Sequence, residues 1–510
     1  MDNYTNNMTD TLMVPEPGQT QAVQPDPAAK EKEECERAGH FMRLDLPCAI
    51  YTLVFVFCMY KNAGAVTTPV WILSLIALIV YFIKSAGKSL KKGSIFLAVV
   101  MMLISVSCFY TANPFTLFMN YAVELMLTLT LVLHNYADDS KWDLGKLLCE
   151  MFAAPFASLS RIYTPFVDGA AFFGKKGTAK KGVTQKILLG VLCSVPVLAL
   201  LGMLLASADL VFMDILDRTF REIDVSNTFL FILMLVFGFF SAYCGIRYMS
   251  ADGAKIVYED QKKADPVTPT TVIVLISVLY LAFSAVQILY LFIGKFSLPE
   301  GMTYATYARQ GFFQLLLVSV LNLIAILFVK KYVRRTTLLD VFLVIICICT
   351  GIMIASSALR MIMYIRAYSL TYDRVAVLVT LLTLSVLLAG VIIYVIFERF
   401  PLMKFTVVAL CVLYTAFAFV KTDNVIVKYN LKYPATESGS DILYISSLSA
   451  DAAPAILEYI KEQQAQGTDM TTTGWYELYY TNNGLNGKFV GIRKYNMSKQ
   501  AANDMLPTPR

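Results

Sequence analysis

Long apolar stretches, separated by short polar segments, occupy most of the chain. A run of about 20 apolar residues is long enough to cross the hydrocarbon core of a bilayer as an α-helix. The pattern therefore predicts an all-α polytopic integral membrane protein with about eleven transmembrane helices. The predicted helices occupy residues 44–60, 68–84, 94–110, 115–134, 187–206, 228–248, 272–293, 309–329, 338–362, 375–397 and 402–421. The ninth is longer than a bilayer requires, so it is expected to tilt or to project beyond the membrane.

Polar segments flank this helical region at both ends. Residues 1–43 contain four prolines and a run of mixed charges, and they are too polar to form a core, so a disordered cytoplasmic tail is expected. Residues 422–510 have the composition of a small soluble domain, of α or α+β class. Helices are predicted at about 452–465 and 496–505, and the stretch beginning at Gly474 is compatible with a strand or a helix. The predicted domains are 1–43, a transmembrane bundle at 44–421, and 422–510.

Basic residues are distributed unevenly between the two sets of loops. With the N-terminus inside, and with the residues at the span ends included, the inner segments hold 26 Lys and Arg residues and the outer loops hold 8. Short loops rich in Lys and Arg stay on the cytoplasmic side of a membrane. The N-terminus is therefore expected in the cytoplasm, and an odd number of spans places the C-terminal domain on the extracytoplasmic side.

Composition excludes several classes of function. The chain is 57% hydrophobic and only 16% charged, so its net charge of +6 orients helices and does not indicate a nucleic-acid partner. The ten cysteines lie mostly within apolar spans and form no CxxC pair, as expected for small buried hydrophobic residues. With only two histidines, no metal site is predicted, and no cofactor is expected.

Two further segments are amphipathic. Residues 143–160 are predicted to form a helix on the inner membrane surface, followed by a basic stretch at 175–181 that suits anionic headgroups. Residues 208–224 alternate apolar and acidic positions at helical spacing, which predicts an interfacial helix on the outer side whose acidic face is solvated.

Arginines and tyrosines gather where three outer segments meet the membrane. The first block is Tyr307-Ala-Arg-Gln-Gly-Phe-Phe-Gln-Leu315, which opens a long apolar helix. The second is Leu359-Arg-Met-Ile-Met-Tyr-Ile-Arg-Ala-Tyr-Ser-Leu-Thr-Tyr-Asp-Arg374. The third comprises Asp423-Asn, Lys428-Tyr-Asn430, Asp441-Ile-Leu-Tyr444 and Leu448-Ser-Ala-Asp-Ala-Ala-Pro454. The predicted topology brings all three to the same side of the membrane.

These blocks support two interpretations. The arginine fork suits phosphate or carboxylate, so the side chains can ring an outward site for an anionic lipid or an envelope precursor. The candidate ligand-binding residues are Tyr307, Arg309, Gln310, Arg360, Tyr364, Arg366 and Arg374. Alternatively, these residues anchor the helices at the interface and dock the C-terminal domain by pairing with Asp373, Asp423 or Asp441.

One acidic residue is predicted to lie inside the membrane. Glu124 falls near the middle of the fourth span, one helical turn from Asn120. A carboxylate at that depth is costly and faces protein or water rather than lipid. The sequence leaves open whether Glu124 takes part in proton coupling or pairs with an arginine. Gln287, Gln314 and Asn322 are expected to form interhelical hydrogen bonds.

The three blocks resemble the signature of a bacterial polytopic membrane family catalogued as a domain of unknown function (DUF4173, close to DUF4153). The first matches a tyrosine-x-arginine-x-glycine-phenylalanine pattern. The second matches except that Ser369 stands where glycine is usual. The resemblance covers roughly residues 300–460 and implies a multi-pass protein of the bacterial cell membrane, but it assigns no catalytic residue.

Three classes of function remain after these exclusions. A non-enzymatic sensory or scaffolding protein of the envelope, with a possible membrane-protein partner, fits the lack of catalytic residues best. A transporter or flippase should have a polar cavity reaching Glu124. A lipid-linked transferase should have clustered acids on the outer side that act as a base or bind metal.

Overall fold

The computed structural model describes residues 41–174, 225–252, 263–289, 304–434, 442–489 and 491–509, with isolated positions at 37, 39 and between 194 and 211. The side chains of residues 304–310 lie outside this description. Contacts divide the chain into two compact units, residues 1–46 with 163–195 and residues 47–162 with 196–510. In the first, the turn Phe41–Asp45 packs against helix α7 (Thr164–Gly174) by stacking Phe41 on Phe172 at 4.7 Å between ring centroids. All that follows concerns the second unit.

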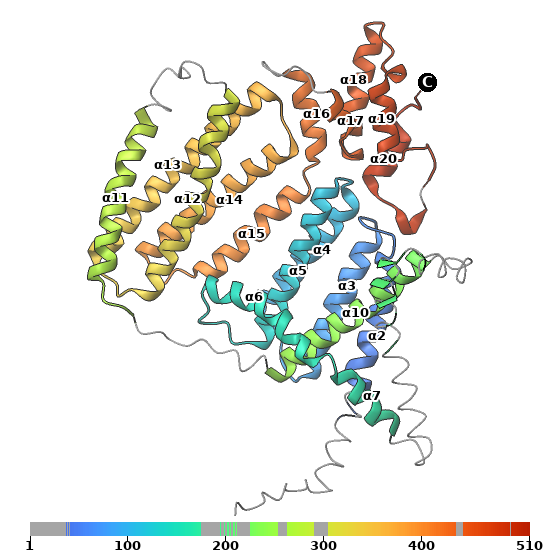
Figure 1. Cartoon of the computed structure of the whole chain (residues 1–510), viewed down its shortest axis with the longest axis horizontal. Helices are drawn as coiled ribbons and strands as arrows, with labels where there is room; N and C mark the ends of the chain where they lie inside the picture. Colours follow the sequence, from blue (N-terminus) through green and yellow to red (C-terminus); the bar gives the residue numbers. More distant parts are fainter. Residues whose placement is uncertain are drawn as a thin grey trace, which may run out of the picture. The chain divides into compact units, whose positions relative to one another are not determined.

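Helices account for nearly all of the described chain, which confirms the predicted fold class (Figure 1). Nine of them are long and apolar enough to cross a membrane. Seven of the nine are α3 (Thr67–Ser85), α4 (Lys92–Tyr110), α5 (Pro114–Tyr136), α10 (Val225–Asp252), α11 (Val267–Gln287), α12 (Tyr304–Tyr332) and α14 (Tyr372–Ile396). The other two are the span Phe41–Met59, which contains α2 (Leu46–Met59), and α13 (Thr337–Tyr368).

The last predicted span corresponds to α15 (Leu402–Ala418), the first helix of a bent pair. It has 17 residues, and α16 (Thr422–Lys432) leaves it at an angle of 61°. At 1.5 Å per residue α15 is about 26 Å long, slightly shorter than a hydrocarbon core of about 30 Å. With this pair, ten of the eleven predicted spans coincide with helices. The predicted span at 187–206 and almost all of the segment at 208–224 lie outside the described residues.

α13 is longer than its predicted span because it continues to Tyr368 rather than ending near residue 362. Its 32 residues correspond to about 48 Å. This exceeds the hydrocarbon core, so its last turns are available to build structure at the membrane border.

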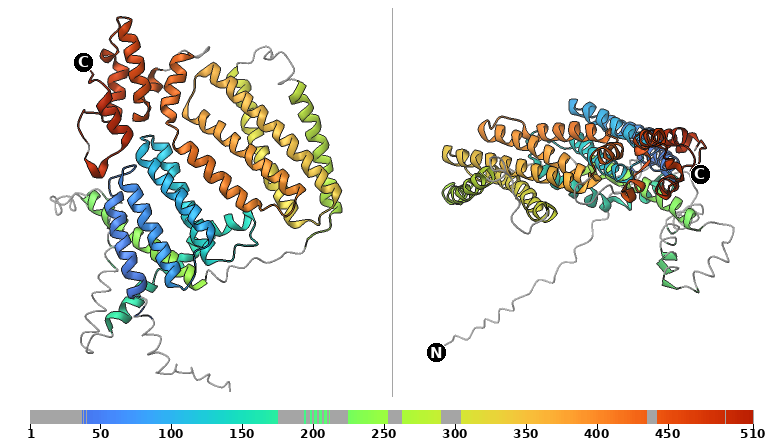
Figure 2. Two further views of the ribbon diagram at one scale, coloured as in Figure 1. Left: turned by 180° about the vertical axis from the view of Figure 1, so that it is seen from behind. Right: turned by 90° about the horizontal axis from the view of Figure 1, so that it is seen from above.

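Two hydrophobic cores hold the bundle together. One core is formed by helices α11, α12, α13 and α14 and continues into the C-terminal helices. The other is formed by α3, α4, α5 and α6 (Leu144–Ser158). α15 packs against α14 on one side and α4 on the other, so it links the two groups (Figures 1 and 2). The amphipathic segment predicted at 143–160 is α6, with Asp143 capping its first turn.

Polar residues inside the bundle are hydrogen-bonded between helices, as expected for a membrane protein. Asn322 of α12 accepts from Tyr280 Oη at 2.8 Å and donates to Thr350 Oγ1 at 2.9 Å. Gln287 of α11 accepts from Ser356 Oγ at 2.6 Å. These contacts confirm the expectation for both residues and tie α13 to its two neighbours.

The C-terminal region is a small helical domain. After α16 come α17 (Ile442–Ser446), α18 (Ala453–Ala465), α19 (Gly474–Asn482) and α20 (Met497–Met505), with short 3-10 turns at Ala450–Ala452, Met470–Thr472 and Ile492–Lys494. The stretch beginning at Gly474 is thus a helix rather than a strand. It is helical because Tyr476, Tyr479 and Tyr480 fall on one face, where they are buried against the domain core.

Candidate functional site

A buried carboxylate, Asp423, joins the C-terminal domain to the bundle. It stands in the first turn of α16 and is fully buried. Asn113, in the loop between α4 and α5, donates to both of its carboxylate oxygens at 3.0 Å. Ser449 donates its backbone N–H at 3.0 Å and its hydroxyl at 2.5 Å. One side chain therefore holds a bundle loop and a segment of the C-terminal domain together.

Asp451 makes a second such connection from the opposite direction. It belongs to the C-terminal domain and is 1% exposed. The backbone N–H of Ala112 donates to its Oδ1 at 2.9 Å, and the Thr111 hydroxyl donates to its Oδ2. We call Asp423 and Asp451, with their partners at 111–113 and Ser449, the carboxylate latch.

The latch uses neutral donors rather than salt bridges. Among the described residues, no lysine or arginine forms an ion pair with Asp423 or Asp451. The predicted pairing of arginines with Asp423 is therefore not what attaches the domain. Charge-assisted hydrogen bonds from neutral groups are strong in a buried site, and their loss leaves several polar groups unsatisfied.

The turn between α13 and α14 is clamped by the same domain. Asn430 of α16 accepts from the backbone N–H of Leu370 at 2.7 Å and donates to its carbonyl at 2.9 Å. The Tyr444 hydroxyl accepts from the backbone N–H of Tyr372 at 2.9 Å. The Tyr372 hydroxyl in turn meets Thr116 Oγ1 at 2.9 Å. Residues of the third sequence block thus hold the backbone of the second block in place.

The last part of the chain makes another attachment to the same end of the bundle. Asn496 donates to the carbonyls of Gly64 and Thr111 at 2.7 and 2.8 Å. Arg493 donates to the carbonyl of Phe57 at 3.0 Å, and Ser498 donates to that of Tyr110 at 2.9 Å. The loops after α2, α4 and α13 and the C-terminal domain therefore lie at one end, as the predicted topology requires.

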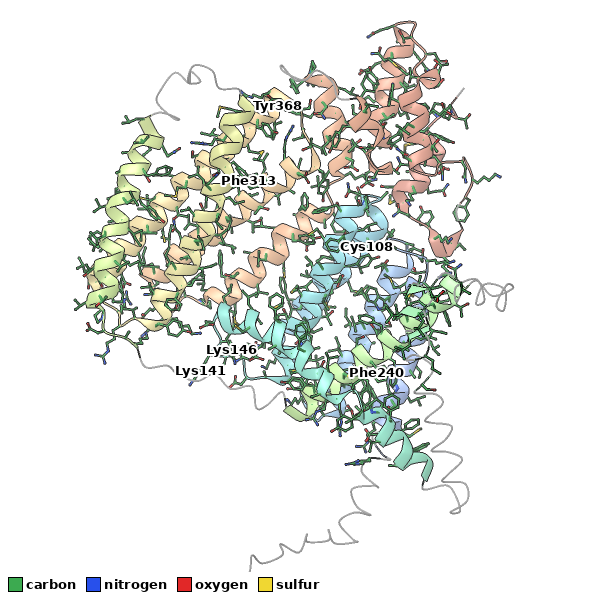
Figure 3. The ribbon with its side chains drawn as sticks, in the orientation of Figure 1. Cys108, Lys141, Lys146, Phe240, Phe313 and Tyr368 are labelled. Atoms are coloured by element: carbon green, nitrogen blue, oxygen red, sulfur yellow. The ribbon has the colours of Figure 1, made fainter. Side chains whose placement is uncertain are left out.

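The opposite end is rich in basic residues (Figure 3 labels Lys141 and Lys146 there). Lys91 donates to Asp139 at 2.9 Å, and Asp139 also bonds His134 Nδ1 at 2.5 Å. Burial alone raises the pKa of Asp139, but the hydrogen bonds from His134 and Lys91 outweigh it and lower the pKa below its usual value. Ion pairs, rather than carboxylate–amide bonds, thus join the loops at this end.

The candidate ligand-binding residues separate into groups. Tyr364 and Arg374 come together: the Arg374 guanidinium carbon lies 4.3 Å from the centroid of the Tyr364 ring. Both line a pocket of about 280 Å³ between α12, α13 and α14. Arg366 is exposed and does not line it. Tyr307, Arg309 and Gln310 fall on the first turns of α12, whose side chains lie outside the described part of the structure.

Arg360 packs against the glycine of the first sequence block. A Cβ atom added at Gly311 would lie 2.9 Å from Arg360 Cζ and still closer to Nη1. Real Cβ atoms do not approach side chains so closely. Because Gly311 has no side chain, the Arg360 guanidinium can pack directly on the surface of α12. This contact connects the first and second blocks.

Ser369 has a backbone conformation that favours glycine. Its φ of 72° and ψ of 168° lie in a region that side chains rarely enter. Its hydroxyl is buried and finds no hydrogen-bond partner within the described part of the chain. Its carbonyl, with that of Tyr368, accepts from Arg374 Nη1. Glycine, which the family pattern leads us to expect here, would adopt this conformation without strain.

Replacing Ser369 by glycine is expected to stabilise the protein. Relief of backbone strain is worth about 1–3 kcal/mol, and the added flexibility of glycine in the unfolded chain costs about 0.5–1 kcal/mol. The apparent melting temperature in detergent should therefore rise. Ser369→Ala is the matched control, because it removes the hydroxyl but keeps the strain. An unchanged melting temperature for Ser369→Gly would contradict the strain argument.

Glu124 and Asn120 are both buried in α5, as predicted, but only Asn120 is hydrogen-bonded in the described structure. Asn120 donates to Ser107 Oγ at 2.8 Å and accepts from Tyr414 Oη at 2.7 Å, so it joins α4, α5 and α15. Glu124 is 2% exposed, and neither carboxyl oxygen has a hydrogen-bond partner among the described residues.

Sequence reasoning missed most of the latch. Thr111, Ala112 and Asn113 were not singled out as candidates, although Asn113 precedes a proline and caps α5 through Thr116. Ser449 was noted only as a helix cap within the third block. Asp451 and Asn430 were seen only as part of the third block. The sequence signal for Asp451 and Asn430 is that Asp, Asn and Ser gather in a segment whose composition is otherwise ordinary.

These observations define a polytopic α-helical membrane protein with a helical C-terminal domain docked on one end of its bundle. The chain belongs to the family described as "Domain of unknown function (DUF4153)", whose model matches residues 98–459. The match confirms the family relationship that the three blocks indicated, with DUF4153 rather than DUF4173 as the family. Comparisons with curated proteins and with solved structures find no match.

Proposed function

We propose that the protein is a non-enzymatic scaffold or sensor of the bacterial cell envelope. In this role the bundle holds the C-terminal domain in a fixed orientation at the extracytoplasmic side of the cell membrane. The carboxylate latch carries the proposal, because two buried acids with neutral donors build a specific connection between domain and bundle. Such a connection transmits a load or a ligand-dependent movement from one part to the other.

The charges at the two ends support this orientation. The end opposite the C-terminal domain carries Lys88, Lys91 and Arg335 in its loops and Lys330 in the last turn of α12. By the positive-inside rule that end faces the cytoplasm. A cysteine introduced at position 488, in a variant with Cys35, Cys149 and Cys193 replaced by serine, should react with a membrane-impermeant maleimide in intact cells. A cysteine at position 92 should not.

The two other classes have less support. A lipid-linked transferase needs accessible acids that cluster on the outer side, but the two acids of the latch, Asp423 and Asp451, are buried and hydrogen-bonded. Transport of an anionic lipid or an envelope precursor is favoured by the buried Glu124. However, Glu124 and Asn120 do not line the pocket that contains Arg374.

Complementation of a deletion strain distinguishes the scaffold from the transporter. Growth under osmotic and detergent stress should be restored by the wild type, by Glu124→Gln and by the surface control Glu458→Ala. Asp423→Ala should not restore it, at equal protein levels in the membrane. If Asp423→Ala is lost from the membrane, Asn496→Ala tests the second attachment instead. Failure of Glu124→Gln together with full activity of Asp423→Ala or Asn496→Ala would favour transport and overturn the scaffold.

A further inference from the structure

The pocket between α12, α13 and α14 has a polar half and an apolar half. It is lined by Phe312 and Phe313 from α12, Met361 and Tyr364 from α13, and Thr371, Asp373, Arg374 and Val377 around the start of α14. Residues 371–374 lie at the end of the bundle that carries the C-terminal domain, whereas Val377 lies about one turn and Met361 about two turns deeper. Polarity therefore falls with depth, as it does along a membrane lipid.

The pocket is placed to open toward lipid. Phe313 is 63% exposed, whereas Phe312 is 2% exposed and closes the inner side. Figure 3 shows Phe313 on α12 and Tyr368 at the end of α13. α12 continues with exposed apolar side chains at Leu317 and Leu321, which suit a lipid-facing surface.

Arg374 supplies a fixed cation at the polar end. Its Nη1 donates to the carbonyl of Tyr368 at 2.6 Å and to that of Ser369, and its guanidinium lies over the Tyr364 ring. These contacts hold the planar group in place, and within the described chain its Nε and Nη2 make no other hydrogen bond. Arginine donors so arranged suit a phosphate. The first turn of α14 adds the positive end of a helix dipole.

Asp373 adds a negative charge to the same pocket. It is exposed, and no ion pair joins it to a basic residue in the described structure. A carboxylate beside the arginine opposes a purely anionic ligand but suits one that carries both charges. Beyond the scaffold role and independently of it, we propose that this pocket binds the headgroup of a zwitterionic aminophospholipid. Its phosphate diester meets Arg374, its primary ammonium meets Asp373, and its acyl chains lie along Phe312, Phe313 and Val377.

The proposal is tested with the full-length protein purified in a neutral detergent. Native mass spectrometry and thermal stability are measured during titration with dioleoyl phosphatidylethanolamine, phosphatidylcholine or phosphatidylglycerol. Phosphatidylethanolamine should bind about tenfold more tightly than phosphatidylglycerol, the effect of one charge-assisted contact. Phosphatidylcholine should bind weakly, because its quaternary ammonium has no N–H to donate to Asp373.

Substitution of the carboxylate provides the decisive comparison. Asp373→Asn should remove the preference for phosphatidylethanolamine over phosphatidylglycerol, whereas the exposed control Glu462→Gln should keep it. Val377→Trp should fill the apolar half and weaken both lipids. Equal binding of the two lipids by the wild type, or an unchanged ratio in Asp373→Asn, would overturn the proposal. Full competition by glycerophosphoethanolamine would show that the ligand is a soluble headgroup and would overturn the assignment to a lipid.

Discussion

Replacement of Asp423 by alanine is expected to detach the C-terminal domain from the bundle. The substitution removes the acceptor of three donors, the Asn113 amide and the backbone and hydroxyl of Ser449. Because these groups are buried, losing their partner costs about 3 kcal/mol or more. The apparent melting temperature should fall, and hydrogen–deuterium exchange should accelerate in α17 to α19 before it does in the spans.

A surface substitution in the same domain serves as the control for Asp423→Ala. Glu458 pairs with Lys428 at 3.0 Å, but both side chains are more than half exposed. An exposed pair contributes about 0–1 kcal/mol, so Glu458→Ala should resemble the wild type. Equal exchange in the two variants would show that the latch does not hold the domain.

Replacement of Gly311 by alanine is expected to destabilise the bundle although alanine favours helices. In an open helical position this change stabilises by about 0.5–1 kcal/mol. At Gly311 the new methyl group meets the Arg360 guanidinium, which must move aside and lose its packing on α12. Because the guanidinium is the end of a flexible side chain, the cost lies at the low end of the range of about 1–3 kcal/mol for overpacking, just enough to outweigh the gain. The melting temperature should therefore fall rather than rise.

Gly351 provides the matched comparison for Gly311→Ala. It also lies within a helix, α13, but a Cβ atom there would make an ordinary contact of 3.5 Å with Leu388. Gly351→Ala should leave the melting temperature unchanged or raise it. In an Arg360→Ala background, Gly311→Ala should lose most of its effect, because contacting residues are coupled. Parallel behaviour of the two glycines would contradict the packing argument.

The three blocks that carry the family resemblance now have a physical meaning. Gly311 of the first receives Arg360 of the second. Asn430 of the third holds the turn of the second, and Asp423 holds the loop before α5. Their role in this structure is to join helices and domain at one end of the bundle. Of the arginines whose side chains are described, Arg360 contributes through packing, and Arg374 contributes through carbonyl contacts and also borders a pocket.

The sequence alone determined the membrane class, the position of ten spans and the change to a soluble composition after residue 421. It could do so because a run of about 20 apolar residues has one stable structure in a bilayer, whatever its neighbours. It also placed the loops after α2, α4 and α13 at one end, since each crossing reverses the direction of the chain. Local signals such as the first-turn proline and the apolar face of α18 were likewise sufficient for α18 and α20, but they left the stretch that forms α19 open between strand and helix.

Only the tertiary structure decided which polar residues meet. Thr111 and Asp451 are separated by 340 positions in the chain, and no local pattern indicates that one donates to the other. The sequence offered arginines as partners for Asp423, because opposite charges attract, but the fold brings neutral amide and hydroxyl donors to it instead. The pocket beside Arg374 likewise exists only because three helices pack at that depth. Contacts between distant segments depend on packing, and packing is set by the whole chain.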